Sequence, residues 1–198
     1  NTNVEYKYCL KQTGFTTAWG NRYNTSQAKL ILGAQIAGLA PNTSLTNVKL
    51  DFAREVLQPM SNRQIESELR SGFTMLYRDE NGDVRWVKDQ TNYTDLNSTV
   101  PHAFTSGLPL RICDAVIMDI KRDYSLNWMG KDPCTPERAK VYRDIVYSML
   151  LDYQKDNYLT NVLPEDVQVE TVDRRTFKLS LGLEPIDATE KLFIDCKV

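Results

Sequence analysis

The residues that could carry out chemistry are few and scattered. His102 is the only histidine, follows Pro101, and has no acidic neighbour in sequence. No serine stands in a nucleophile elbow, and no glycine-rich phosphate loop precedes a helix. Three aspartates on one predicted helix, Asp114, Asp119 and Asp123, are interspersed with Lys121 and Arg122. Such a mixture is typical of a solvated face, so we predict no enzyme activity, no cofactor and no metal site.

The four cysteines, Cys9, Cys113, Cys134 and Cys196, lie far apart in sequence. No two have the spacing of a zinc knuckle or a redox motif. Cys113 falls on the apolar face of a predicted helix, where a free thiol behaves as a small hydrophobic side chain. The cysteines are interpreted as reduced structural thiols, with a Cys9–Cys196 disulfide as the alternative because both lie near chain ends.

Four Asn-X-Ser/Thr triplets begin at Asn24, Asn42, Asn92 and Asn97. They leave a second function open, that of a secreted or surface glycoprotein acting as a binding module. Asn, Ser and Thr also dominate turns because their side chains form local hydrogen bonds. The glycoprotein is therefore the alternative function, and occupied triplets together with oxidised cysteines would support it.

Composition and charge are those of an ordinary globular protein. The 198 residues are 41% apolar and 25% charged, with a net charge of −2. This length predicts one domain over residues 1–198 with a substantial core. The charge gives no basic field for nucleic acid, and the longest apolar stretch, around Leu30 to Ala40, is too short to insert across a membrane. Because the chain begins at Asn1 rather than Met, we expect a fragment of a longer protein.

The first half of the chain predicts short strands around one helix. Residues 1–12 alternate apolar and polar side chains, as a half-buried strand does. Residues 14–25 are rich in Gly, Asn and Thr and predict a loop. A helix is expected from Ser26 to Gly38, and a second alternating run covers residues 48–52.

Two local motifs follow in the same half. Ser61 and Gln64 have the spacing of a capping box, and the helix that they open should end at Gly72. Residues 73–79 and 83–89 flank Glu80-Asn81-Gly82, where Asn81 and Gly82 are expected to supply the positive φ angles of a tight hairpin.

The second half predicts two long helices and three strands. Apolar residues from Leu110 to Trp128 recur at helical spacing, and a helix over residues 136–156 begins at the N-cap Thr135 and Pro136. Strands are expected at 167–171, 176–183 and 190–198. The predicted fold class is α+β, with two main helices and further short helices packed on a mixed or antiparallel sheet. Trp86 and Trp128 are predicted core residues, and Trp19 is the candidate for an interface.

Several stretches resemble one family when they are taken in order. The first pair is Ile36-Ala37-Gly38-Leu39-Ala40 and Asn42-Thr43-Ser44-Leu45-Thr46, and the helix at 62–72 follows. The last two are Leu110-Arg111-Ile112-Cys113-Asp114-Ala115-Val116 and Pro185-Ile186-Asp187-Ala188-Thr189-Glu190-Lys191-Leu192. Together they cover most of residues 28–198 and resemble the inner, C-terminal conserved domain of tail sheath proteins from contractile phages and related contractile injection systems. Cys113 and Cys134 match no family pattern, and the family's outer variable domains are missing.

The resemblance implies a structural protein of a bacteriophage tail. Subunits of this family form stacked hexameric rings around a tail tube, as a helical sheath. The sheath contracts and drives the tube through the cell envelope for viral genome ejection. The implied partners are further copies of the chain, the tail tube protein, and the baseplate and tail terminator proteins. The implied location is the virion tail, assembled in the host bacterial cytoplasm.

The resemblance also implies two sets of contact residues. Terminal arms in the family add strands to the sheet of a neighbouring subunit, so residues 185–198 are the expected arm. The inner domain carries the tube contact, for which we expect the polar face of the 136–156 helix, at Lys140, Arg143 and Lys155. The residues expected to exchange as a strand are Lys191, Leu192, Phe193, Ile194, Asp195, Cys196, Lys197 and Val198.

Overall fold

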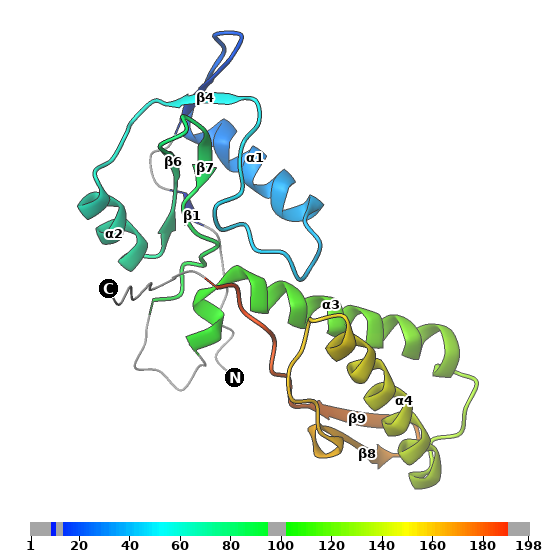
Figure 1. The fold of residues 1–198 in the computed structure, drawn as a ribbon. Coiled ribbons are helices and arrows are strands. Elements are labelled where there is room, and N and C mark those ends of the chain that lie inside the picture. Colours follow the sequence, from blue (N-terminus) through cyan, green and yellow to red (C-terminus); the bar gives the residue numbers. More distant parts are fainter. Residues whose placement is uncertain (1–8, 11–13, 95–101, 190–198) are drawn as a thin grey trace, which may run out of the picture. The chain divides into compact units, whose positions relative to one another are not determined.

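The computed structural model describes residues 9–10, 14–94 and 102–189 of the chain (Figure 1). Its contacts divide into two compact units. Unit 1 comprises Asn1–Leu108 with Asp187–Val198, and unit 2 comprises Pro109–Ile186. The expectation of a single domain over 1–198 stays a prediction. The C-terminal run 190–198 and most of the predicted strand at 1–12 lie outside the described residues.

The strands of unit 1 are short and form small sheets. β2 (Phe15–Thr17) lies between β3 (Arg22–Tyr23) and β4 (Ala53–Val56), and both pairings are antiparallel. β6 (Leu76–Arg78) and β7 (Val84–Trp86) form an antiparallel hairpin. β1 (Cys9–Leu10) pairs in parallel with β5 (Phe73–Thr74).

The helices of unit 1 begin at side-chain caps. α1 (Thr25–Gly38) starts at Asn24, whose Oδ1 accepts the Gln27 N–H at 3.0 Å, while Gln27 Oε1 accepts the Asn24 N–H at 2.9 Å. α2 (Asn62–Arg70) starts where the capping box predicted, and it is followed by Gly72 at φ +80°. A short 3-10 helix, η1 (His102–Thr105), precedes α3.

Local backbone geometry corrects two predictions in unit 1. Residues 14–25 are not a loop, because β2 and β3 form a hairpin through a turn with Gly20 at φ +81°. The alternating run 48–52 forms an isolated β-bridge between Lys49 and Arg85, and the Leu50 N–H donates to the Val84 carbonyl at 2.8 Å. In the β6–β7 loop only Gly82 has a positive φ, +86°, so the expectation for Asn81 is wrong.

The core of unit 1 is closed by aromatic side chains. Trp86 and Phe15 are both 0% exposed. The Phe15 ring stacks on Tyr23 with centroids 5.0 Å apart and meets Phe52 at 5.7 Å. The Trp86 indole N–H donates to the Gln35 side chain, which joins β7 to α1. These contacts confirm Trp86 as a core residue.

Unit 2 consists of two helices and one hairpin. α3 (Gly107–Asp123) continues as a π-helical turn, η2 (Tyr124–Trp128), and α4 (Pro136–Lys155) begins at the N-cap Thr135. After the short 3-10 helix η3 (Pro164–Asp166), β8 (Val167–Asp173) and β9 (Thr176–Leu181) pair antiparallel. In Figure 1 both long helices lie on the same side of this hairpin. The α+β class is confirmed, with the strands distributed over several small sheets.

Candidate assembly surfaces

The residues first considered for chemistry have structural partners. Asp119 accepts a hydrogen bond from Arg122 at 2.6 Å, and Asp123 accepts one from Asn127 at 2.7 Å. Within the described part of the chain, no group of three His, Cys, Asp or Glu side chains is placed to hold a metal ion. The described helices are also too short or too polar to cross a membrane.

Unit 2 contains an apolar groove of about 590 Å³ between α3, α4 and β9. β9 contributes alternate residues, Phe177, Leu179 and Leu181, because every second side chain of a strand points to the same face. The remaining lining side chains are Ile117, Ile120, Lys121, Tyr124, Met129 and Tyr142. We call this feature the α3–β9 groove.

The two strands of the hairpin are covered differently. α4 packs on β8, and Val167 at the start of β8 is buried. Phe177, Leu179 and Leu181 on β9 are only half-buried, since the groove lies beside them. Among the described residues, β8 is the only strand that pairs with β9. β9 therefore offers both an unpaired backbone edge and an apolar side-chain face.

An aromatic cluster lies beside the α3–β9 groove, and its members Tyr124 and Tyr142 line the groove. Trp128 is 6% exposed, as predicted for a core residue, and meets the Tyr142 ring edge-on at 4.9 Å. The Arg138 guanidinium lies 4.9 Å from the Trp128 ring centroid and pairs with Asp132. Burial, with the nearby Asp123 charge, raises the pKa of Tyr142 to about 12. The π-helical turn that places Trp128 here gave no signal in the sequence pattern.

A side-chain hydrogen bond joins the two long helices. The Tyr153 hydroxyl on α4 donates to the Asp119 carboxylate on α3. Burial first, and this bond second, raise the pKa of Tyr153 well above its ordinary value.

The three cations expected to face a tube are exposed on α4. Two of them are already paired within the helix: Arg143 contacts Asp144 at 2.7 Å, and Lys155 contacts Asp152 at 2.7 Å. Lys140 lies one turn after Glu137. Hydrogen bonds from the Glu137 backbone N–H and the Thr135 side chain, together with the Lys140 charge, lower the pKa of the Glu137 carboxyl. The face therefore carries alternating charges, and its role in a tube contact stays a prediction.

The residues that lead into the expected arm are fixed in place. Pro185 forms a β-bridge with Leu159, and the Ile186 N–H donates to the Tyr158 carbonyl at 3.1 Å. One residue later, the Asp187 carboxylate accepts a hydrogen bond from the Ser106 hydroxyl at 3.1 Å. The expected strand-exchange residues, 191–198, lie outside the described residues, and their role stays a prediction.

Trp19, the interface candidate, lies at the tip of the β2–β3 hairpin and is 79% exposed. At the other end of this hairpin, the Phe15 ring stacks on the Tyr23 ring. The described cysteines, Cys9, Cys113 and Cys134, are free thiols. Burial raises the pKa of Cys113, as expected for a thiol on an apolar helix face.

The fold is that of sheath tail proteins, which confirms the resemblance at the level of structure. The sheath tail protein of Desulfitobacterium hafniense superposes with a TM-score of 0.80 and 20% identity, covering 94% of this chain and 44% of that protein. The sheath tail protein of Listeria innocua gives 0.79 and 21%, covering 93% and 44%. The anti-feeding prophage helical sheath, solved in its contracted state, gives 0.72 and 14%, covering 96% and 55%.

Two curated proteins of Bacillus subtilis (strain 168) are also similar in sequence. The uncharacterized protein YqbK is 26% identical over 188 residues, and the phage-like element PBSX protein XkdK is 25% identical over 190 residues. The chain spans 40% of the length of each of these relatives, and each match covers 90% of the chain. No family model matches the chain.

Proposed function

We propose that this chain is the inner part of a contractile tail sheath subunit, a structural protein without enzyme activity or cofactor. The observation that carries the proposal is the shared fold with two sheath tail proteins over 93–94% of the chain. In this proposal copies of the subunit stack as hexameric rings around a tail tube and contract to drive the tube through a cell envelope. Baseplate and tail terminator proteins bind the two ends, and the sheath belongs to a virion tail assembled in the host bacterial cytoplasm.

Strand exchange and the tube contact are the two molecular parts of the proposal. The arm at 185–198 adds a strand to a neighbouring copy, which is supported by the hydrogen-bonded residues at its start, Pro185 and Asp187, and by an unpaired β9 edge among the described residues. The tube contact uses Lys140, Arg143 and Lys155 on α4. Exposed ion pairs contribute only about 0–1 kcal/mol each, so exchanging intrahelical pairs for pairs with a tube protein costs little in either direction. Such a contact suits a sheath that must release the tube on contraction.

Electron microscopy of the full-length expressed subunit tests this function. We expect hollow tubular polymers with sixfold rings, and loss of these tubes when residues 191–198 are deleted. A matched truncation control replaces the same residues by a Gly/Ser sequence of equal length, which keeps the chain length but removes the strand pattern. A strictly monomeric protein over a wide concentration range would contradict the proposal. The alternative of a surface glycoprotein has no support from Asn24, whose side chain caps α1.

A further inference from the structure

The turn of the β2–β3 hairpin carries an exposed aromatic side chain beside a charged pocket. Trp19 stands on this turn and is 79% exposed. Ala18, the residue before it, lines a pocket of about 320 Å³ in unit 1. The charged side chains that line the same pocket are Lys49, Asp51, Arg54, Arg78 and Asp83. We call Trp19 together with this pocket the hairpin-tip site.

The hairpin-tip site has a surplus of positive charge. Lys49 is paired with Asp83, with Nζ and Oδ1 2.9 Å apart. Arg54 and Arg78 are both exposed, and neither forms an ion pair within the described residues. Against these two cations the pocket holds the Asp51 carboxylate. Tryptophan and arginine are the side chains that most often dominate the binding energy of protein interfaces, and a guanidinium binds a carboxylate through two hydrogen bonds.

Unit 2 presents an exposed turn with the opposite chemistry. Residues 156–173 contain five acidic side chains and no lysine or arginine. Within this segment Leu163 is 41% exposed, and the exposed Pro164 and Glu165 follow it. Glu165 forms no ion pair in the part of the chain that the structure describes. The turn is fixed in shape, because the Leu163 N–H donates to Asp166 Oδ2 at 2.7 Å. We call these three residues the 163–165 turn.

Two other exposed apolar positions of unit 2 match the hairpin-tip site less well. Ile145 lies beside Asp144, whose carboxylate is already paired within α4. Met118 on α3 is 64% exposed, but Lys121 lies one helical turn further on and would bring a like charge to the arginines of the site. The 163–165 turn combines exposed apolar side chains with a carboxylate that is free to pair.

We propose that the hairpin-tip site of one copy binds the 163–165 turn of a second copy. The Trp19 ring packs on Leu163 and Pro164, and the Glu165 carboxylate accepts hydrogen bonds from the two unpaired arginines. This inference rests on the proposed function, which supplies the second copy. Because the two surfaces differ, the contact is heterologous, and each copy keeps one free surface of each kind. Such contacts close into a ring or continue as a helical filament.

A titration between variants of the full chain tests the contact. The tracer is a fluorescent Trp19→Ala chain, which keeps the 163–165 turn and loses the tip. One titrant is Glu165→Lys, which keeps the tip and loses the turn, and the other carries both substitutions. We expect the first titrant to bind the tracer about ten-fold more tightly than the second, measured by anisotropy. Strand exchange through the C-terminal arm contributes equally to both titrations and cancels from the comparison.

A charge exchange identifies the groups that meet. Adding Arg54→Glu to the Glu165→Lys titrant should remove most of its advantage, because a carboxylate then faces the Glu165 of the tracer. Adding Glu165→Lys to the tracer as well should restore most of the lost affinity. That recovery also shows that the substituted chains are folded. Arg63→Glu on α2 makes the same charge change at another exposed position of unit 1 and should leave binding unchanged.

The outcomes separate this inference from the proposed function. Equal binding of the two titrants, or a charge exchange that restores nothing, would overturn the inference. Tubular polymers of the full-length subunit together with equal titrants would keep the sheath function and remove this contact. Tip-dependent binding without tubular polymers would keep the contact and remove the sheath function.

Discussion

The two units differ in how completely their apolar side chains are buried. In unit 1, short strands and loops are tied by buried polar groups, and the large aromatic Trp86 is fully enclosed. In unit 2, α4 packs on β8, and β9 lies beside an apolar groove. Unit 1 therefore encloses its largest core side chain, whereas the apolar side chains of β9 in unit 2 stay half-buried.

This difference suggests that the two units contribute differently to the stability of the single chain and to the binding of a further chain. A protein that must first exist as a subunit needs one region whose stability does not depend on neighbours. A region with half-buried apolar side chains contributes less to the stability of the single chain, and more once another chain covers it. Substitutions in the two units measure this contrast, and the largest losses are expected at fully buried apolar positions.

The largest effect is expected in the core of unit 1. Trp86→Ala removes a side chain that is 0% exposed and should lower the free energy of unfolding by about 3–5 kcal/mol. Trp19→Ala removes the same side chain from a site that is 79% exposed and should change it by at most about 0.5 kcal/mol. Urea unfolding of both variants measures the difference. Similar losses for the two would mean that Trp19 packs on the chain.

The second comparison is made within unit 2. Leu150→Ala on α4, at a fully buried position, should cost about 2–5 kcal/mol. Leu179→Ala on β9 should cost only about 1 kcal/mol in the single chain, because its side chain already borders the groove. Denaturant unfolding of unassembled protein gives both values. A Leu179 loss as large as that of Leu150 would show that the groove is already covered within one copy.

The third effect concerns a buried carboxylate of unit 1. Asp89 is 0% exposed, and its Oδ2 accepts the Leu45 N–H at 2.9 Å. Asp89→Ala should cost about 1–3 kcal/mol, because a buried donor loses its acceptor. The exposed Asp51 serves as the matched control, and Asp51→Ala should be close to neutral. If denaturant unfolding finds the two variants equally stable, the buried hydrogen bond of Asp89 does not stabilise the loops of unit 1.

The smallest effect is a pH dependence in the β6–β7 hairpin. Hydrogen bonds from the Arg85 side chain first, and from the Asp83 backbone, hold the carboxyl pKa of Asp79 below its ordinary value. The folded pKa is lower than the unfolded one, so this stabilisation is present above about pH 4 and is lost as the pH falls through the folded pKa. Asp79→Asn should therefore lower stability at neutral pH, with a difference that shrinks in acid.

Thermal unfolding between pH 7 and pH 2 follows this difference. Glu80→Gln removes a carboxylate from the neighbouring exposed position and serves as the control. A stability difference between Asp79→Asn and the unmodified protein that stays constant down to pH 2 would contradict the assigned pKa direction.

The long elements could be predicted from the sequence because their signals are redundant. Thr135 and Pro136 fix the start of α4, and its apolar stripe extends to its end. The strands β8 and β9 were likewise predicted from alternation and a polar turn. Short elements carry too few residues for a period to show. In β2 and β3, for example, the Phe15 ring packs on Tyr23 and on the distant Phe52. A contact with a residue so far along the chain cannot be predicted from the local sequence.

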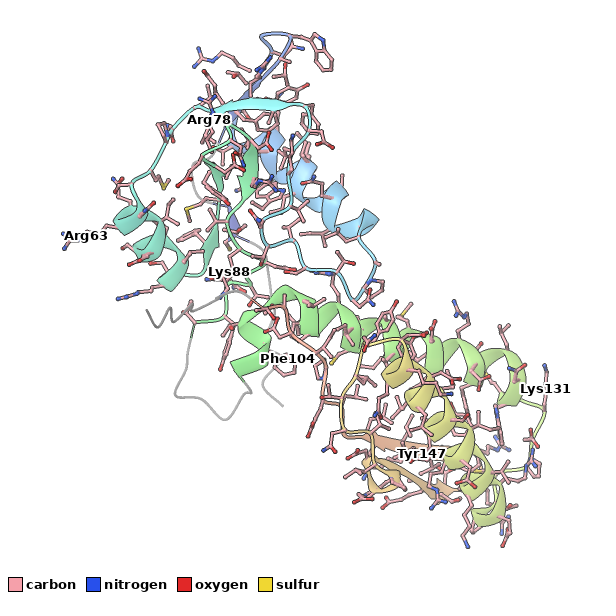
Figure 2. The ribbon with its side chains drawn as sticks, in the orientation of Figure 1. Arg63, Arg78, Lys88, Phe104, Lys131 and Tyr147 are labelled. Carbon is pink, nitrogen blue, oxygen red and sulfur yellow. The ribbon has the colours of Figure 1, made fainter. Side chains whose placement is uncertain are left out.

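The candidate surface was only partly accessible to the same reasoning. The alternation of β9 gave its apolar face, but the groove depends on where α3 passes relative to that strand. The helical spacing of apolar residues predicts the burial of Trp128, but it gives no sign of the π-helical turn over Tyr124–Trp128 or of the Tyr142 ring as the partner. The charges on α4 lie on an exposed face as predicted, but their intrahelical partners, Asp144 and Asp152, do not follow from the apolar stripe. Figure 2 shows the side chains of this helix, with Tyr147 labelled.

The hydrogen bonds around Pro185 determine the order in which contacts would meet a pull on the C-terminal segment. The Leu159–Pro185 bridge, with the Thr160 N–H to Glu184 carbonyl bond at 2.9 Å, holds the chain in unit 2, and the Ser106–Asp187 bond holds the next residue in unit 1. A pull on the chain beyond Ala188 therefore meets the Ser106–Asp187 side-chain hydrogen bond before it reaches the backbone bonds of Ile186 and Pro185.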